Sequence, residues 1–147
     1  PEVVLAGRKI NNSMPDWIID RVILGLSHKN KTIKGSKILI MGLTFKENCP
    51  DIRNSKSITL INKIKAHDVS LTIWDGWADI NECKKNHNVD IVNSFPKNKK
   101  FSAVICLVKH NEFMKLTYKE WQNLIEKEGI YFDLKGIIPI RLNPIRP

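Results

Sequence analysis

Residues 37–55, KILIMGLTFKENCPDIRNS, contain the features that decide the fold. Residues 37–41 are an apolar run of strand length, which is typical of a strand covered on both faces, as in a parallel sheet. Residues 42–55 form a largely polar loop, and Asn54 or Ser55 can then cap a helix. The order strand, loop, helix therefore predicts the first half of a crossover unit in a parallel sheet.

The residues on both sides extend this pattern. Residues 7–28, with Ser13 as a possible N-cap, and the residues after 55 carry apolar side chains at helical spacing, the second stripe being Ile58, Leu60, Ile61 and Ile64. We expect further strands at 68–75, 89–92, 101–108 and 130–134, and a helix at 118–126 with Trp121, Leu124 and Ile125 inward. Because strands alternate with helices, the predicted fold class is α/β, a Rossmann-like open parallel sheet with flanking helices.

The composition is that of one globular domain with an excess of positive charge. The 147 residues include 24 Lys+Arg and 15 Asp+Glu, and the formal charge of +9 would attract nucleic acid, anionic lipid or a nucleotide. No apolar run approaches the roughly 18 residues that cross a bilayer, which excludes a membrane span. Three cysteines without paired spacing predict free thiols in a reducing cytoplasm rather than a disulfide framework. The lysines lie in separate linkers, so no continuous nucleic-acid track is predicted.

The loop at 42–55 is the candidate binding site, because ligands of open α/β sheets bind beyond the carboxyl ends of the strands. Lys46 follows Gly42 by four residues and Arg53 stands just before the expected helix, so two cations lie near a positive helix end, an arrangement that suits anionic oxygens. The three spaced glycines of the dinucleotide fingerprint are missing, as is the Gly-Lys-Ser/Thr phosphate loop. A nucleotide here would be held mainly by side chains; the alternative is a solvated loop with two surface cations.

A family resemblance rests on residues 42–55, on residues 7–11 with Met14 before them, and on residues 73–75 and 132–136 after them. Together they resemble the C-terminal UDP-binding domain of the UDP-glucose/GDP-mannose dehydrogenase family, and within it the Vi-capsule type of UDP-N-acetylhexosamine 6-dehydrogenases. The resemblance implies an intact enzyme that uses NAD to oxidise the sugar C6 alcohol to a carboxylate in polysaccharide biosynthesis. It also implies an N-terminal NAD domain and a central helical dimerisation segment.

The resemblance implies a division of the chain and a set of partners. Residues 1–30 correspond to the end of the central segment, and residues 31–147 to the UDP-binding domain. The chain begins with Pro1 and no signal-peptide pattern follows, so we expect a part of a longer protein. The expected partners are the UDP-sugar, the N-terminal domain of the same polypeptide and a second copy in a homodimer, with no nucleic acid and no membrane.

Four site residues follow from the same resemblance. Phe45 and Lys46 correspond to residues that pack on and bond the nucleotide-sugar, and Arg53 to the arginine that reaches the NAD. Lys135 corresponds to a basic substrate contact, although relatives carry two adjacent arginines where this chain has Lys135 and Gly136. The family's catalytic cysteine lies in a motif ending Cys-x-x-Lys-Asp that this sequence lacks, so the chain alone is expected to be inactive.

Other polar residues receive a structural interpretation. Cys49 has no histidine base nearby in the sequence and is expected to be a small loop residue rather than a nucleophile. Cys83 and His87 are too few for a metal site. We expect His28, His67 and His110 to be solvated, Asp75 to serve a turn or cap, and Trp74 to be buried. Two alternatives stay open, a basic α/β nucleic-acid-binding module and a domain that serves mainly in assembly.

Overall fold

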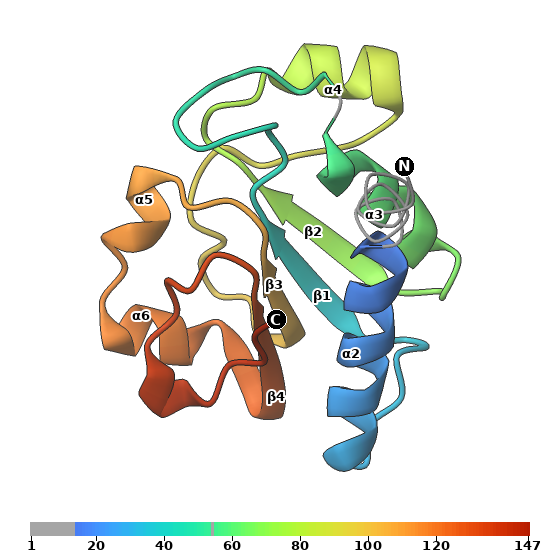
Figure 1. Cartoon of the computed structure of the whole chain (residues 1–147), viewed down its shortest axis with the longest axis vertical. Helices are drawn as coiled ribbons and strands as arrows, with labels where there is room; N and C mark the ends of the chain where they lie inside the picture. Colours follow the sequence, from blue (N-terminus) through green and yellow to red (C-terminus); the bar gives the residue numbers. More distant parts are fainter. Residues whose placement is uncertain (1–13, 54) are drawn as a thin grey trace, which may run out of the picture.

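The computed structural model describes residues 14–53 and 55–147 and is built on a parallel sheet (Figure 1). The four strands have the order β2-β1-β3-β4, and every pair is parallel. The strands are β1 (Lys37–Met41), β2 (Ser70–Trp74), β3 (Phe101–Cys106) and β4 (Ile125–Asp133). The predicted α/β fold with an open parallel sheet is therefore confirmed.

Helices and the last part of the chain cover both faces of the sheet. The helices are α2 (Met14–His28), α3 (Lys56–Lys65), α4 (Ile80–His87), α5 (Asn111–Met114), α6 (Tyr118–Asn123) and the 3-10 helix η1 (Ile140–Leu142). One apolar cluster joins α2 and α3 to the sheet, and a second joins α5, α6 and Ile138 to the opposite face. Figure 1 shows α2 and α3 on one side of the strands and α5 and α6 on the other.

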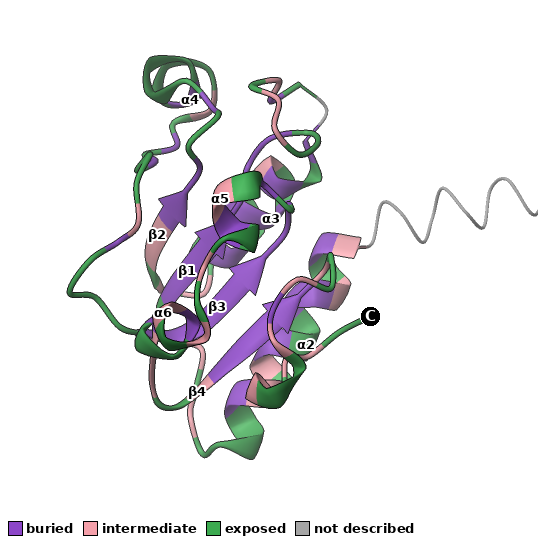
Figure 2. Cartoon of the chain, turned by 90° about the vertical axis from the view of Figure 1, so that its left-hand side faces the viewer, coloured by how far each residue is buried: buried purple, intermediate pink, exposed green. Residues whose placement is uncertain are grey.

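The inner strands show why residues 38–41 of β1 are all apolar. Ile38 and Ile40 belong to the cluster under α2 and α3, whereas Leu39 and Met41 belong to the opposite cluster. Successive side chains of a strand point to opposite faces, so both sets are removed from water. Figure 2 shows this burial along the strands, between partly exposed helices.

The structure corrects three of the predicted elements. The helix predicted at 118–126 ends at Asn123, and the strand predicted from residue 130 already begins at Ile125. The backbone of this segment pairs with β3, since Phe101 N–H donates to the carbonyl of Leu124 at 2.8 Å. Residues 89–92 contribute only one isolated bridge, between Val92 and Trp74.

The structure tests some of the remaining predictions, which concern helix ends and the division of the chain. The predicted helix start at residue 7, its cap Ser13 and the alternative cap Asn54 lie outside the described residues, whereas Ser55 caps α3 as predicted. The polar segment near residue 80 forms α4, because Asp79 caps its first turn. The division at residues 30 and 31 stays a prediction. In the described part of the chain no helix is long and apolar enough to cross a membrane.

Candidate functional site

A cavity of about 430 Å³ opens where β1, β3 and β4 end and α2 and α3 begin. Its apolar lining includes Ile18 of α2, Leu60 of α3, and Leu107 and Leu134, which follow β3 and β4. Its polar lining includes Lys46, Lys56 and Lys135. The cavity therefore combines an apolar floor with three cationic side chains.

Residues 42–55 connect β1 to α3 and form one wall of the cavity. Gly42 has a φ of +98°, and a Cβ on this residue would lie 2.5 Å from the Cβ of Val108, so the turn requires glycine. Ser55 accepts a hydrogen bond from Ser57 N–H at 3.1 Å and donates one to the carbonyl of Leu43 at 2.6 Å. These bonds hold the start of α3 against the end of β1.

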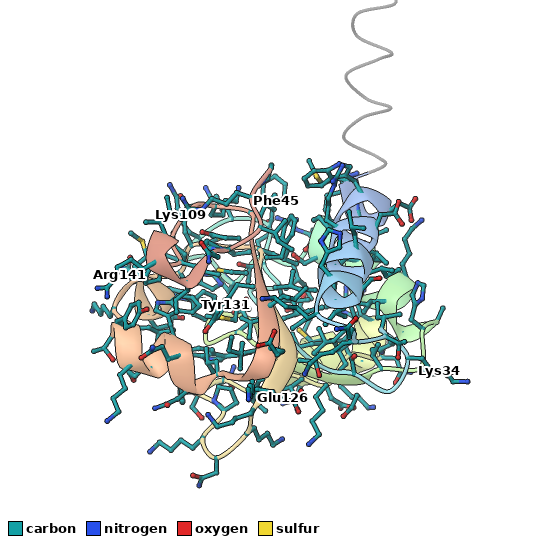
Figure 3. All side chains as sticks on the ribbon, turned by 90° about the horizontal axis from the view of Figure 1, so that it is seen from below. Lys34, Phe45, Lys109, Glu126, Tyr131 and Arg141 are labelled. Atoms are coloured by element: carbon teal, nitrogen blue, oxygen red, sulfur yellow. The ribbon has the colours of Figure 1, made fainter. Side chains whose placement is uncertain are left out.

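Phe45 and Lys46 lie at the tip of this wall and both line the cavity. The Phe45 residue is 61% exposed, which is unusual for an aromatic residue, and its ring is accessible to a planar partner. Figure 3 shows Phe45 at the same edge of the molecule as Lys109, with Lys34 at the opposite side. Lys109, which comes directly after the buried residues that extend β3, was not predicted from the sequence.

Glu47 is a carboxylate among these cations. Its own backbone hydrogen bond lowers its pKa most, and the charges of Lys109, Lys135 and Lys46 lower it further, although partial desolvation acts in the opposite direction. Because the charges of three lysines act on this one carboxylate, the three ammonium groups lie in the same region of the surface. The resulting positive region is suited to an anion.

Lys135 reaches the cavity from a second loop, which follows β4. The carboxylate of Asp133 accepts hydrogen bonds from the N–H groups of Gly136, Ile137 and Ile138 at 2.9–3.1 Å. The same carboxylate accepts a hydrogen bond from Arg146 Nε at 3.1 Å. A buried acid at the end of a strand thus fixes the loop that carries a cavity cation.

A second buried acid, Asp75, organises the loop of Phe45 and Lys46. One of its oxygens accepts hydrogen bonds from Trp77 and Ala78 N–H at 2.8 and 2.9 Å, which confirms the predicted turn role. The other oxygen lies 2.9 Å from Nε2 of His110, and both side chains are fully buried. Burial alone would raise the pKa of Asp75, but the hydrogen bonds from His110 and from backbone N–H groups outweigh it and lower the pKa.

The prediction that His110 is solvated was therefore wrong. Its ring is enclosed because the loop after β3 returns across the ends of β1 and β2, where Asp75 and Thr44 supply polar partners. His28 is exposed and His67 partly exposed, in agreement with the prediction. The expected burial of Trp74 is also confirmed, with its ring against Phe113 of α5.

Arg53 stands apart from the other three predicted site residues. It does not line the cavity, its side chain is 83% exposed, and its guanidinium binds Asp51 in a bidentate pair at 3.0 and 3.1 Å. The hydrogen bonds from Arg53 lower the pKa of Asp51. The structure thus brings together Phe45, Lys46 and Lys135 around the cavity, and Arg53 is not among the lining residues.

The chemistry of the lining suits the binding of an anion. The described lining residues contain no cysteine or histidine, and Ser55 is engaged in capping α3. Cys49 is half-buried in the loop, outside the cavity lining. No group of three or more possible metal ligands occurs among residues 14–53 and 55–147. The arrangement can hold an anionic group that is attached to a planar or apolar group.

Comparison with known proteins gives a family match. Residues 39–140 match the profile described as "UDP-glucose/GDP-mannose dehydrogenase family, UDP binding domain". The matched range includes the loop at 42–55 and Lys135. It therefore contains all the residues that the structure places around the cavity except those of α2.

Individual relatives agree with this match. Protein CapL of Staphylococcus aureus is 41% identical over 94% of this chain and 32% of its own length. UDP-N-acetyl-D-glucosamine 6-dehydrogenase of Salmonella typhi is 30% identical over 99% of this chain and 34% of its own length. The chain thus spans about a third of the length of these curated relatives.

A solved structure shares the fold. The crystal structure of NDP-N-acetyl-D-galactosaminuronic acid dehydrogenase from Methanosarcina mazei matches 94% of this chain and 28% of its own length, with a TM-score of 0.82. The sequences are only 18% identical, so this likeness concerns the fold alone.

Proposed function

Because this chain belongs to the UDP-glucose/GDP-mannose dehydrogenase family and matches its UDP binding domain, we propose that the cavity beside Phe45, Lys46 and Lys135 binds the UDP part of a nucleotide-sugar. The observation that carries the proposal is that these three side chains, from two loops far apart in the sequence, line one cavity. The lysines neutralise the diphosphate, and the ring of Phe45 packs on a planar or apolar part of the ligand.

The proposal extends to the intact protein, of which this chain is one domain. Its activity is the NAD-dependent oxidation of a UDP-N-acetylhexosamine at C6 to the uronate, in the biosynthesis of a polysaccharide such as a capsule. The names of the Salmonella typhi relative and of CapL support this assignment. The intact protein works as a homodimer in the cytoplasm, and the catalytic cysteine and most of the NAD site belong to its other domains.

Arg53 contributes to the NAD site in this proposal. Its guanidinium is highly exposed and already oriented by Asp51, so it can contact a phosphate of NAD held by another domain. NAD accepts the hydride from the sugar, and this chain's own part is to bind the UDP and to orient Arg53. The described cavity lining fits this role, since Lys46 and Lys135 supply cations for the diphosphate.

Calorimetric titration with UDP tests the proposed site. Lys46→Ala should weaken UDP binding about tenfold or more, because a charge-assisted hydrogen bond to phosphate is lost. Lys34→Ala is the matched control, since it removes the same charge on the opposite side of the molecule (Figure 3). Uridine should bind much more weakly than UDP. Equal UDP affinity in wild type and Lys46→Ala would remove Lys46 from the site.

A thermal-shift comparison separates this function from nucleic-acid binding. UDP should raise the melting temperature, because a ligand that binds only the folded state stabilises it. A short DNA duplex at moderate salt should have little effect. Stabilisation by the duplex but not by UDP would favour the basic nucleic-acid-binding module instead.

A further inference from the structure

The loop that carries Phe45 and Lys46 rests on a buried polar unit formed by Asp75 and His110. Neither residue lines the cavity, so neither is placed to touch a ligand held there. Both are fully buried, at 0% exposed side chain, and their polar atoms lie 2.9 Å apart. Burial of a charged or polar group costs free energy unless the group is hydrogen-bonded, so the hydrogen bonds of Asp75 and His110 indicate their role.

The first end of the loop is bonded to Asp75. Its Oδ2 accepts hydrogen bonds from Leu43 N–H at 2.7 Å and from Thr44 N–H at 3.3 Å. The hydroxyl of Thr44 lies 3.2 Å from Nε2 of His110 and donates to the carbonyl of Lys46 at 2.8 Å. The backbone on both sides of Phe45 is thereby connected to the buried unit.

The second end of the loop is bonded to His110. Its Nδ1 accepts a hydrogen bond from Asn48 N–H at 2.9 Å. Since Nδ1 accepts, we assign the ring proton to Nε2, which donates to Asp75. Asn48 has a φ of +55°, an uncommon conformation that its side-chain bonds with Asn111 also support.

We propose that His110 is a positioning residue for the nucleotide site, and that it sets the place of Phe45 and Lys46 by holding Asn48 through Nδ1 and Asp75 through Nε2. The inference rests on the proposed function of the cavity. Residues 45–47 lie between these two bonded ends, and Phe45 N–H makes one further bond, to the carbonyl of Asp51 at 2.8 Å. Release of either end should therefore shift the side chains that face the ligand. Trp77 and Phe113 pack on the ring of His110 and keep its two nitrogens directed at these partners.

Two amide variants separate the two hydrogen bonds. In His110→Asn the side-chain oxygen can take the place of Nδ1 and accept from Asn48 N–H, whereas in His110→Gln the amide nitrogen can take the place of Nε2 and donate to Asp75. Asp75 keeps its backbone donors in both variants, but Asn48 N–H loses its acceptor only in His110→Gln. His110→Gln should therefore bind UDP about tenfold more weakly than wild type, and His110→Asn within about threefold of it.

The control is Tyr131→Phe, which removes a buried hydrogen bond to the carbonyl of Trp121 away from the cavity lining. UDP affinity from calorimetry and unfolding midpoints from urea titration should be measured for all variants. Tyr131→Phe should lower the midpoint and leave UDP affinity unchanged. The proposal is overturned if both His110 variants bind UDP like wild type, or if their affinities follow the loss of stability alone.

Two further results separate the role of His110 from the proposed binding of UDP. If wild type does not bind UDP while it is folded, the proposed function fails, whatever the His110 variants do. If His110→Gln does not fold, hydrogen exchange in wild type replaces it. The Asn48 amide should then be protected and gain protection with UDP, and fast exchange of this amide in both states would overturn the role of His110.

Discussion

Arg146 Nε lies 3.1 Å from Oδ2 of Asp133, and the Arg146 guanidinium also donates to the carbonyl of Ile138 at 2.7 Å. Asp133 is fully buried and bonds the backbone of the loop that carries Lys135. The two strand-end acids, Asp75 and Asp133, thus have parallel roles. Each fixes one of the two cationic loops of the cavity by accepting hydrogen bonds from backbone N–H groups.

Replacement of Arg146 should therefore weaken both the fold and the site. Arg146→Met should lower the free energy of unfolding by about 2–3 kcal/mol, because the buried carboxylate loses its cation but keeps its backbone donors. UDP affinity should fall as well, since the Lys135 loop is less fixed. Urea unfolding and calorimetry measure the two effects.

Arg141→Met is the control for Arg146→Met. The Arg141 guanidinium lies 5.1 Å from the centre of the partly exposed ring of Tyr118 and is not paired with Asp133. Its loss should therefore lower the free energy of unfolding by less than about 1 kcal/mol. Equal effects of the two variants on stability would contradict the special role of the Asp133 pair.

Gly42 allows a second comparison within the chain. Gly42→Ala should destabilise the fold by about 2–5 kcal/mol, because the added Cβ is strained at a positive φ and also lies too close to Val108. Gly35→Ala should cost only about 1–2 kcal/mol, since its φ is +78° but nothing lies within 4 Å of the added Cβ. Similar unfolding midpoints for the two variants would show that the contact at Val108 relaxes easily.

The sheet was predictable from the sequence where burial alone decides the structure. Residues 38–41 of β1 and 103–106 of β3 are buried between both faces of the sheet, so their sequences are continuously apolar. The segment around Leu124 and Ile125 was misassigned, because its apolar spacing fits a helix face while its backbone pairs with β3. The spacing of apolar residues depends on one segment alone and does not predict which distant strand that segment pairs with.

The site was predictable in part for a related reason. Lys46 and Lys135 follow strands, and parallel strands end at one edge of the sheet, so their meeting follows from topology. Arg53 belongs to the same loop as Lys46, but its guanidinium is paired with Asp51 and does not line the cavity. The burial of His110 depends on loops that converge from three parts of the chain, which no local pattern reveals.

The stability of the fold should depend on pH through Asp75. Its pKa is lowered from the ordinary value of 3.8, so its contribution to stability is complete above that value and is lost as the pH falls through the lowered pKa. Asp75→Asn should be less stable than wild type by a constant amount between pH 7 and about pH 5, and this difference should narrow below about pH 4.

Urea unfolding of both proteins across this pH range tests the prediction for Asp75. Asp90→Asn is the control, since Asp90 is 84% exposed and forms only a surface pair with Lys84 at 3.3 Å. Its difference from wild type should stay near zero at every pH. A gap between wild type and Asp75→Asn that stays constant down to pH 3 would mean that Asp75 does not titrate as a stabilising anion.

The three cysteines should differ sharply in reactivity toward iodoacetamide. Burial and the nearby charge of Asp75 raise the pKa of Cys83 to about 11, and burial raises the pKa of Cys106 as well, whereas Cys49 is half-buried in the site loop. Because the thiolate is the reactive form, mass spectrometry at pH 8 should find fast labelling at Cys49 alone, and labelling of all three in urea. Cys49→Ser should abolish the fast phase and leave UDP affinity unchanged, as expected for a loop residue outside the cavity lining. Loss of turnover in the intact enzyme carrying Cys49→Ser would instead assign Cys49 a part in catalysis.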